Sequence, residues 1–207
     1  MTSFLFVLGA YLWGSLSPSY LLARLARGVD LREYAHHEVD GTALGLLLGA
    51  PWNRVIGLID CAKGILPPLL AQVLGLDLNI IVLAGLAVVA GHNWSVYLKF
   101  MGGRGLAAAL GVVLVWDWRL FVLLAVSYAL DQLLKQNDRL PMLGFLLLAP
   151  AAWLLGDAQQ IITGGLALAL LIGVKRLEAN RLPLPADPRE KRIVLWRRWW
   201  TDHDEVI

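Results

Sequence analysis

Two ionisable side chains lie within an otherwise apolar stretch of the chain. Asp60 and Lys63 are three residues apart, and this spacing places them on one face of a helix, where they can form an ion pair. Charged groups at membrane depth are costly and usually face the interior of a helix bundle or a water-filled cavity. We therefore predict a polar site near the inner membrane surface. An ion pair that only fixes helix packing is the alternative.

A glycine-rich run with one cation follows a histidine further along the chain. His92 precedes the sequence Gly102-Gly103-Arg104-Gly105. Glycine lets backbone N–H groups approach a phosphate closely, and an arginine and a following helix N-terminus both add positive potential. The run therefore predicts an anion cradle. A flexible turn between closely packed helices, with His92 as an interfacial histidine, is the alternative.

Two further clusters carry side chains with binding chemistry. The run His36-His37-Glu38-Val39-Asp40 holds metal-ligand types, but adjacent histidines point in different directions, so a solvated loop is favoured and no metal site is predicted. The run Trp196-Arg197-Arg198-Trp199-Trp200 combines side chains that prefer lipid headgroups and anionic lipids. This second run favours a membrane anchor over a nucleic-acid site.

The elements that must position these residues are membrane helices. The chain of 207 residues is 58% hydrophobic and only 16% charged, whereas soluble domains carry about 25% charged residues. We expect an all-α polytopic membrane protein with about seven transmembrane helices. A span needs about 20 residues, so the short fourth, sixth and seventh segments should be tilted, broken or only partly spanning. The seven apolar segments are 3–25, 52–74, 80–98, 105–116, 118–134, 141–155 and 159–174.

The charges are distributed unequally across this predicted topology. Apart from Lys63 and Arg119, all Lys and Arg residues, Lys135 among them, lie in alternate connections, at their flanks or in the tail. The positive-inside rule then places the N-terminus outside and the C-terminus in the cytoplasm. We expect a transmembrane domain over residues 1–175 and a basic, Trp-rich cytoplasmic tail over residues 176–207. No internal repeat of the kind found in many transporters is evident.

The motifs together resemble those of the membrane-integral acyl-phosphate:glycerol-3-phosphate acyltransferases, the PlsY family. Residues 60–64 are similar to the family's Asp-x-x-Lys-Gly, and residues 91–105 are similar to its longer motif from Gly-His to Gly-Gly-Lys-Gly, with Arg104 at the lysine position. Residues 14–15, 20–21, 30–33 and 175–182 resemble further family motifs. The resemblance covers nearly the whole chain.

The resemblance implies an enzyme of phospholipid synthesis in the cell membrane, surrounded by membrane lipids and without a nucleic-acid partner. It would transfer a fatty acyl group from acyl-phosphate to the 1-hydroxyl of glycerol 3-phosphate, giving lysophosphatidic acid, with no cofactor or metal. Asp60 would orient the site. The implied catalytic residues are Thr42, Lys63, His92, Arg104 and Asn180. The implied phosphate-binding residues are Lys63, Gly64, Gly102, Gly103, Arg104 and Gly105.

One loop departs from the family pattern. Where the family has Ser-Gly-Asn-x-Gly-Ala-Thr-Asn-x-x-Arg, residues 36–46 keep only the threonine, Thr42. The leucine at the last position cannot bind phosphate, and Glu38 and Asp40 repel an anionic substrate. A non-catalytic relative that keeps the fold and binds a lipid or protein partner is therefore the alternative. A changed donor or acceptor, with His36 or His37 in a new role, is a third hypothesis.

Overall fold

Helices account for most of the chain that the computed structural model describes, which comprises residues 2–34, 37–134 and 139–201. No strand occurs in those ranges, so the all-α prediction is confirmed. His36 and Lys135 lie outside the described residues. The helices are α1 (Thr2–Ser15), α2 (Pro18–Arg27), α3 (Gly41–Leu48), α4 (Ala50–Val73), α5 (Leu78–Asn93), α6 (Leu106–Trp116), α7 (Trp118–Leu134), α8 (Arg139–Leu154), α9 (Gln159–Glu178) and α10 (Pro188–Trp200), with the 3-10 turns η1 (Leu31–Glu33), η2 (Val96–Leu98) and η3 (Ala179–Arg181).

Each of the seven predicted apolar segments coincides with a helix or with two successive helices. Within the described ranges, four stretches are long and apolar enough to cross a membrane, namely Thr2–Arg27, Ala50–Val73, Leu78–Leu98 and Gln159–Arg181. Helices α6 and α8 are shorter, as predicted. The seventh segment was predicted too short, because α9 continues to Glu178 through two buried basic residues. The number of crossings, the sides of the termini and the domain boundary at residue 175 stay predictions.

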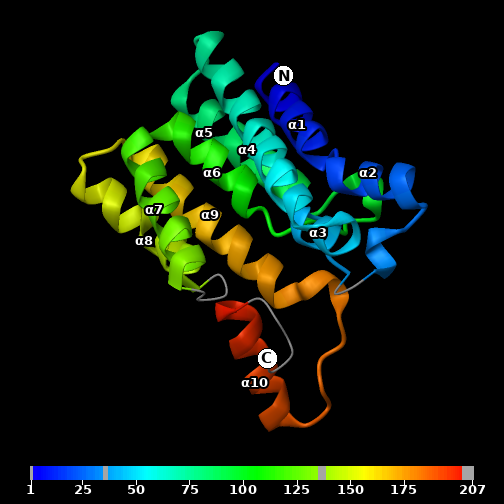
Figure 1. Cartoon of the computed structure of the whole chain (residues 1–207). Coiled ribbons are helices and arrows are strands. Elements are labelled where there is room, and N and C mark those ends of the chain that lie inside the picture. The colour runs from blue at the N-terminus through cyan, green and yellow to red at the C-terminus, as the bar shows by residue number, and fades with distance from the viewer. Residues whose placement is uncertain (1, 35–36, 135–138, 202–207) are drawn as a thin grey trace.

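The first apolar segment is broken near one end. Helix α1 ends at Ser15 and α2 begins at Pro18, because proline suits the first helical position, where a backbone N–H would be unpaired anyway. Ser17 caps α2 by accepting a hydrogen bond from the backbone N–H of Tyr20 at 3.3 Å. The break turns α2 away from the axis of α1 (Figure 1). It also leaves the carbonyl of Leu16 available to a side chain from α4.

Glycines allow two pairs of helices to pack with their backbones in contact. An added Cβ at Gly14 or Gly91 would overlap a carbonyl oxygen of the facing helix in the α1–α5 pair. Gly64 and Gly111 play the same part between α4 and α6. Small residues are the usual means of close helix contact in membranes. These contacts hold α1, α4, α5 and α6 side by side (Figure 1). The first half of α4 therefore lies next to the C-terminal end of α5.

Prolines interrupt the hydrogen bonds of α4 near the predicted ion pair. Pro67 has no N–H, so the carbonyl of Lys63, four residues earlier, loses its partner within the helix. The indole N–H of Trp13 in α1 donates to this carbonyl at 3.2 Å. Helix α1 therefore supplies the missing hydrogen bond and is held against α4 at this level.

Two apolar clusters stabilise the bundle. The larger one lies among α5, α6, α7, α8 and α9 and includes Val112, Leu124 and Phe145. The smaller one packs residues of α2, α3 and the preceding loop, such as Leu44, against Ile56 of α4. The apolar helix α3 forms within the connection between the first two segments, because this second cluster buries one of its faces.

Helix α10 packs back against α9, at one end of the bundle (Figure 1). Trp199 contacts the backbone at Gly173 and the edge of the larger cluster. Arg198 is only 2% exposed and donates to two backbone carbonyls at the end of α9 and beyond it. Trp196 is 65% exposed. Within the predicted anchor, Trp199 and Arg198 thus stabilise the tail and Trp196 is exposed; binding of the tail to lipid stays a prediction.

Candidate active site

A cavity of about 520 Å³ lies among the ends of five helices. Its wall comes from the start of α3, the first half of α4, the end of α5, the start of α6 and one face of α7. Helices distant in sequence therefore meet at one concave surface, the usual setting for a small-molecule site. Of the predicted site residues, the cavity wall includes Thr42, Asp60, His92, Arg104 and Gly105.

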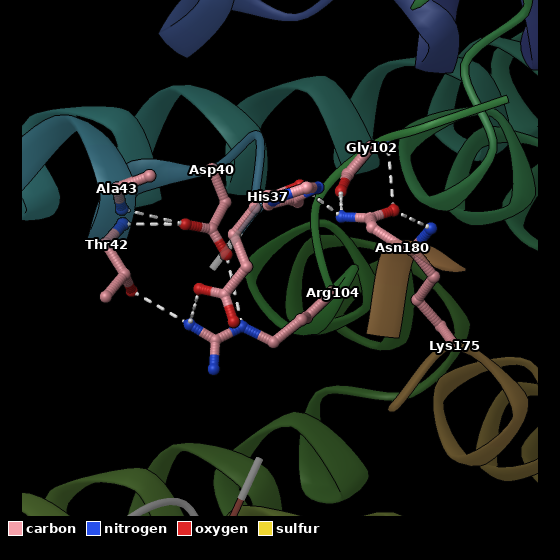
Figure 2. Close-up of polar contacts among 9 residues, drawn as sticks. His37, Asp40, Thr42, Ala43, Gly102, Arg104, Lys175 and Asn180 are labelled. Atoms are coloured by element: carbon pink, nitrogen blue, oxygen red, sulfur yellow. Dashed lines mark hydrogen bonds and ion pairs between the residues drawn. The ribbon is translucent and has the colours of Figure 1, made fainter. Parts of the chain in front are cut away.

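Arg104 faces this cavity but is held by an acidic loop. Its Nε donates to Asp40 Oδ2 at 3.1 Å, and its Nη2 donates to the hydroxyl of Thr42 at 3.1 Å (Figure 2). The same Nη2 lies 3.1 Å from a carboxylate oxygen of Glu38. The side chains of Arg104 and Glu38 are only 10% and 14% exposed, so the pair is largely shielded from water. Carboxylates thus occupy positions around the guanidinium where an anionic ligand was predicted.

Asp40 has a structural role that was not predicted from the sequence. Its Oδ1 accepts hydrogen bonds from the backbone N–H groups of Thr42 at 2.9 Å and Ala43 at 3.2 Å. These bonds cap the N-terminus of α3, for which aspartate is a favoured residue. The signal was present in the sequence, since an aspartate stands directly before an apolar helical run. Asp40 therefore both starts α3 and orients Arg104, in addition to contributing negative charge.

Asp60, Lys63 and His92 form a buried cluster next to the cavity. Lys63 Nζ lies 3.1 Å from Asp60 Oδ1 and 3.1 Å from His92 Nδ1, and it donates to the carbonyl of Leu16 at 2.9 Å. The ion pair predicted from the spacing of Asp60 and Lys63 is confirmed. The ammonium thus donates to one backbone carbonyl and lies close to a carboxylate oxygen and a ring nitrogen. Lys63 is 6% exposed and is not part of the cavity wall, and its contacts hold His92 and the end of α1. Its predicted phosphate-binding role stays a prediction.

The glycine-rich run packs tightly around the end of α5. A Cβ at Gly102 would overlap the carbonyl oxygen of His92, and one at Gly103 would overlap its imidazole Nε2. Gly105 has φ +78°, a conformation that favours glycine, and it lies against the side chain of Asn93. The run therefore brings Arg104 close to His92, as an anion cradle requires, but of its glycines only Gly105 is part of the cavity wall.

Two further predicted site residues, Gly64 and Asn180, are not part of the cavity wall. Gly64 packs against the backbone of α6 and is a helix-contact residue, which is why no larger side chain fits there. Asn180 donates to the carbonyls of His37 at 2.7 Å and Gly102 at 2.9 Å, and accepts from Lys175 at 2.6 Å (Figure 2). It joins the end of α9 to two loops behind Arg104. Its contacts are those of a positioning residue, and its catalytic role stays a prediction.

The cavity wall also contains polar residues that the sequence analysis did not select. Asn53 and Arg54 come from the first turns of α4, and Tyr128 and Gln132 come from α7. Tyr128 and Gln132 are four residues apart, a spacing that places both on one face of an apolar helix. This spacing of two polar residues in an apolar helix could have identified them as site residues from the sequence. Arg54 brings a second cation to the cavity, although its position in the sequence suggested only a topological role.

The chain matches one protein family over most of its length. Residues 4–182 fit the family model described as glycerol-3-phosphate acyltransferase. A glycerol-3-phosphate acyltransferase of Thermoanaerobacter pseudethanolicus is 32% identical over 83% of this chain and 89% of its own length. Glycerol-3-phosphate acyltransferase 4 of Dehalococcoides mccartyi strain CBDB1 is 42% identical over 51% of this chain and 45% of its own length. The chain spans about half the length of this and other such relatives that it matches.

A solved structure shares the fold. It is the crystal structure of PlsY (YgiH), an integral membrane glycerol 3-phosphate acyltransferase, in its glycerol 3-phosphate form. The TM-score is 0.77 with 26% sequence identity, and the match covers 86% of this chain and 90% of that chain. The membrane fold expected from the sequence is thereby confirmed. The match to the family model and the shared fold show that this chain belongs to the glycerol-3-phosphate acyltransferase family.

Proposed function

We propose that this protein transfers a fatty acyl group from acyl-phosphate to the 1-hydroxyl of glycerol 3-phosphate, giving lysophosphatidic acid for phospholipid synthesis. One observation carries the proposal. The cavity collects Thr42, Asp60, His92 and Arg104 from four separate segments into a single wall. Membership of the family and the fold shared with PlsY support it further.

The proposed reaction needs positioned substrates more than reactive side chains. The hydroxyl oxygen attacks the acyl carbonyl carbon, the bond from that carbon to the phosphate oxygen breaks, and inorganic phosphate leaves with the hydroxyl proton. Because acyl-phosphate is already activated, the reaction requires no cofactor and no acyl-enzyme intermediate. Holding the two reacting atoms in contact can supply about 7–11 kcal/mol of the barrier in favourable cases.

The cavity offers three sources of positive potential for the substrate phosphates. Arg104 and Arg54 bring two guanidinium groups to the wall, and the first residues of α6, Leu106 and Ala107, lie there as well. Among the described residues no side chain caps the N-terminus of α6, so its first N–H groups are available to an anion bound in the cavity. Lys63 acts in this proposal through His92, whose ring it holds in place.

The competing hypothesis is a non-catalytic relative that binds lipid or protein. The altered loop motivates it, since only Thr42 remains of the family pattern there. Yet the hydroxyl of Thr42 still accepts a hydrogen bond from Arg104 at the cavity, and the relatives that match along most of their length are named acyltransferases. We therefore favour an enzyme with slow turnover.

The test is acyl transfer by purified protein in detergent, with labelled glycerol 3-phosphate and palmitoyl phosphate as the donor. Wild type should form lysophosphatidic acid slowly, and palmitoyl-CoA should not replace palmitoyl phosphate. Arg104→Ala should lower kcat/KM by roughly tenfold to a hundredfold, since a charge-assisted hydrogen bond contributes about 1.5–3 kcal/mol. Arg189→Ala, in the exposed tail helix, is the matched control. Wild-type turnover no faster than that of Arg104→Ala would favour the non-catalytic hypothesis.

We also propose that the protein lies in the cell membrane with its N-terminus outside, seven spans and a cytoplasmic tail. The one-sided distribution of Lys and Arg supports this orientation. Cysteines introduced next to Asp77 or Asp157 should react with an impermeant reagent added outside intact cells. Cysteines next to Gly103 or Arg189 should react only after the membrane is opened, and external labelling beside Gly103 would contradict the seven-span topology.

A further inference from the structure

We infer that Glu38 determines the substrate affinity of this site, because its carboxylate occupies the anion position on Arg104 and must leave before a substrate phosphate binds there. This inference rests on the proposed function. It starts from one contact, in which an oxygen of Glu38 lies 3.1 Å from Arg104 Nη2. Phosphate oxygens bind guanidinium groups at nearly the same distance and with the same charge complementarity. The two anions therefore compete for one donor.

The surroundings of the pair make this competition strong. Both side chains are mostly buried, so water screens their attraction less than it would at the protein surface. Arg104 also binds Asp40 through Nε. A phosphate that approached with both carboxylates in place would meet two negative charges beside its intended cation. Displacement of one carboxylate is thus a condition for tight binding.

Glu38 is the carboxylate that can be displaced. Asp40 is anchored, because its other oxygen caps α3 through two backbone N–H groups. Moving Asp40 would uncap the helix, whereas the Glu38 side chain can rotate about three bonds without moving the backbone. Val39 between them is buried in the smaller apolar cluster and fixes the loop on both sides. The loop therefore holds beside Arg104 one carboxylate that is anchored to the backbone and one on a longer, rotatable side chain.

The kinetic consequence is a raised KM for glycerol 3-phosphate with little change in kcat. The substrate must offset the lost Glu38–Arg104 contact on binding, but once Glu38 has left, the reacting atoms are positioned as they would be without it. The same competition weakens the binding of inorganic phosphate. An acceptor substrate with less negative charge loses less affinity, so the acidic loop shifts selectivity away from dianionic acceptors.

The experiment compares wild type with Glu38→Gln, which keeps the size of the side chain and removes its charge. Glu33→Gln is the matched control, since Glu33 lies in the same connection but is exposed and outside the cavity. We expect Glu38→Gln to lower the KM for glycerol 3-phosphate about tenfold or more, the ratio that corresponds to 1.4 kcal/mol. Its kcat should stay within about twofold. An unchanged or higher KM, or an equal fall in Glu33→Gln, would overturn the inference.

A binding measurement separates this inference from the proposed function. Titration calorimetry of the purified protein with inorganic phosphate and with glycerol 3-phosphate needs no turnover. Tighter binding of both by Glu38→Gln supports the competition even if no acyl transfer is detected, in which case the proposed function alone fails. Equal binding by wild type and variant rejects the competition. If Glu38→Gln unfolds, Glu38→Asp, which keeps the charge but shortens the side chain, should still bind phosphate more tightly than wild type, and weaker or equal binding rejects it.

Discussion

Lys63→Met is the change that best separates the role predicted from sequence from the role that the structure supports. As a phosphate ligand, Lys63 would matter for substrate binding and little for stability. In the structure its ammonium lies among Asp60, His92 and the carbonyl of Leu16, and Lys63 itself is not part of the cavity wall. Removing it leaves the carboxylate of Asp60 buried without its nearest cation. We therefore expect a large loss of stability.

The size of this loss follows from the burial of the pair. Removing one partner of a buried ion pair typically costs about 3–5 kcal/mol. For a chain of this length, each kcal/mol lowers Tm by about 2–4 °C, so the expected drop is on the order of 6–20 °C. Asp60→Asn combined with Lys63→Met should recover part of this loss, with a coupling energy of up to about 3 kcal/mol, because the second change removes the unpaired charge.

Thermal unfolding of the purified variants in detergent measures the loss, and steady-state kinetics on the same samples measures KM. Lys191→Met, in the exposed part of α10, is the control for removing a lysine charge and should leave Tm unchanged. A Lys63→Met protein that unfolds at the wild-type temperature, but binds the substrate phosphates more weakly, would refute the positioning role. Lys63 would then reach the cavity, as the sequence analysis predicted.

Three further predictions concern other parts of the fold. Gly64→Ala should cost about 1–3 kcal/mol in unfolding experiments because its methyl group overlaps α6, whereas Gly57→Ala, with open space at the same helix, should not destabilise. Burial raises the pKa of Asp157, and the neighbouring carboxylate of Asp117 in the α6–α7 turn raises it further. The free energy of unfolding therefore falls as pH rises through that pKa. Asp157→Asn should remove this fall when unfolding is measured as a function of pH. Trp199→Ala should lower Tm, whereas Trp196→Ala should only weaken binding of the protein's tail to anionic vesicles in flotation assays.

Several features of the site followed from local patterns in the sequence. The ion pair of Asp60 and Lys63 depends on a three-residue spacing in one helix, and the structure contains it. The closeness of His92 and Arg104 depends on a short glycine-rich connection, which allows few other arrangements. The predicted positions of the helices held because hydrophobic segments of membrane length have little alternative to helical structure. Such features need only residues close together in the chain.

The roles of Lys63, Asn180 and Glu38 depended instead on contacts between distant segments. Asn180 joins loops near residues 37 and 102, and Arg104 pairs with an acidic loop more than 60 residues earlier. The spacing of residues in the sequence does not predict which of several oppositely charged groups a side chain will pair with. That choice depends on how helices pack and which groups lose contact with water. The sequence by itself determined the membrane helices, the family motifs and the local ion pair, and only the tertiary structure decided which of the charged groups face the cavity.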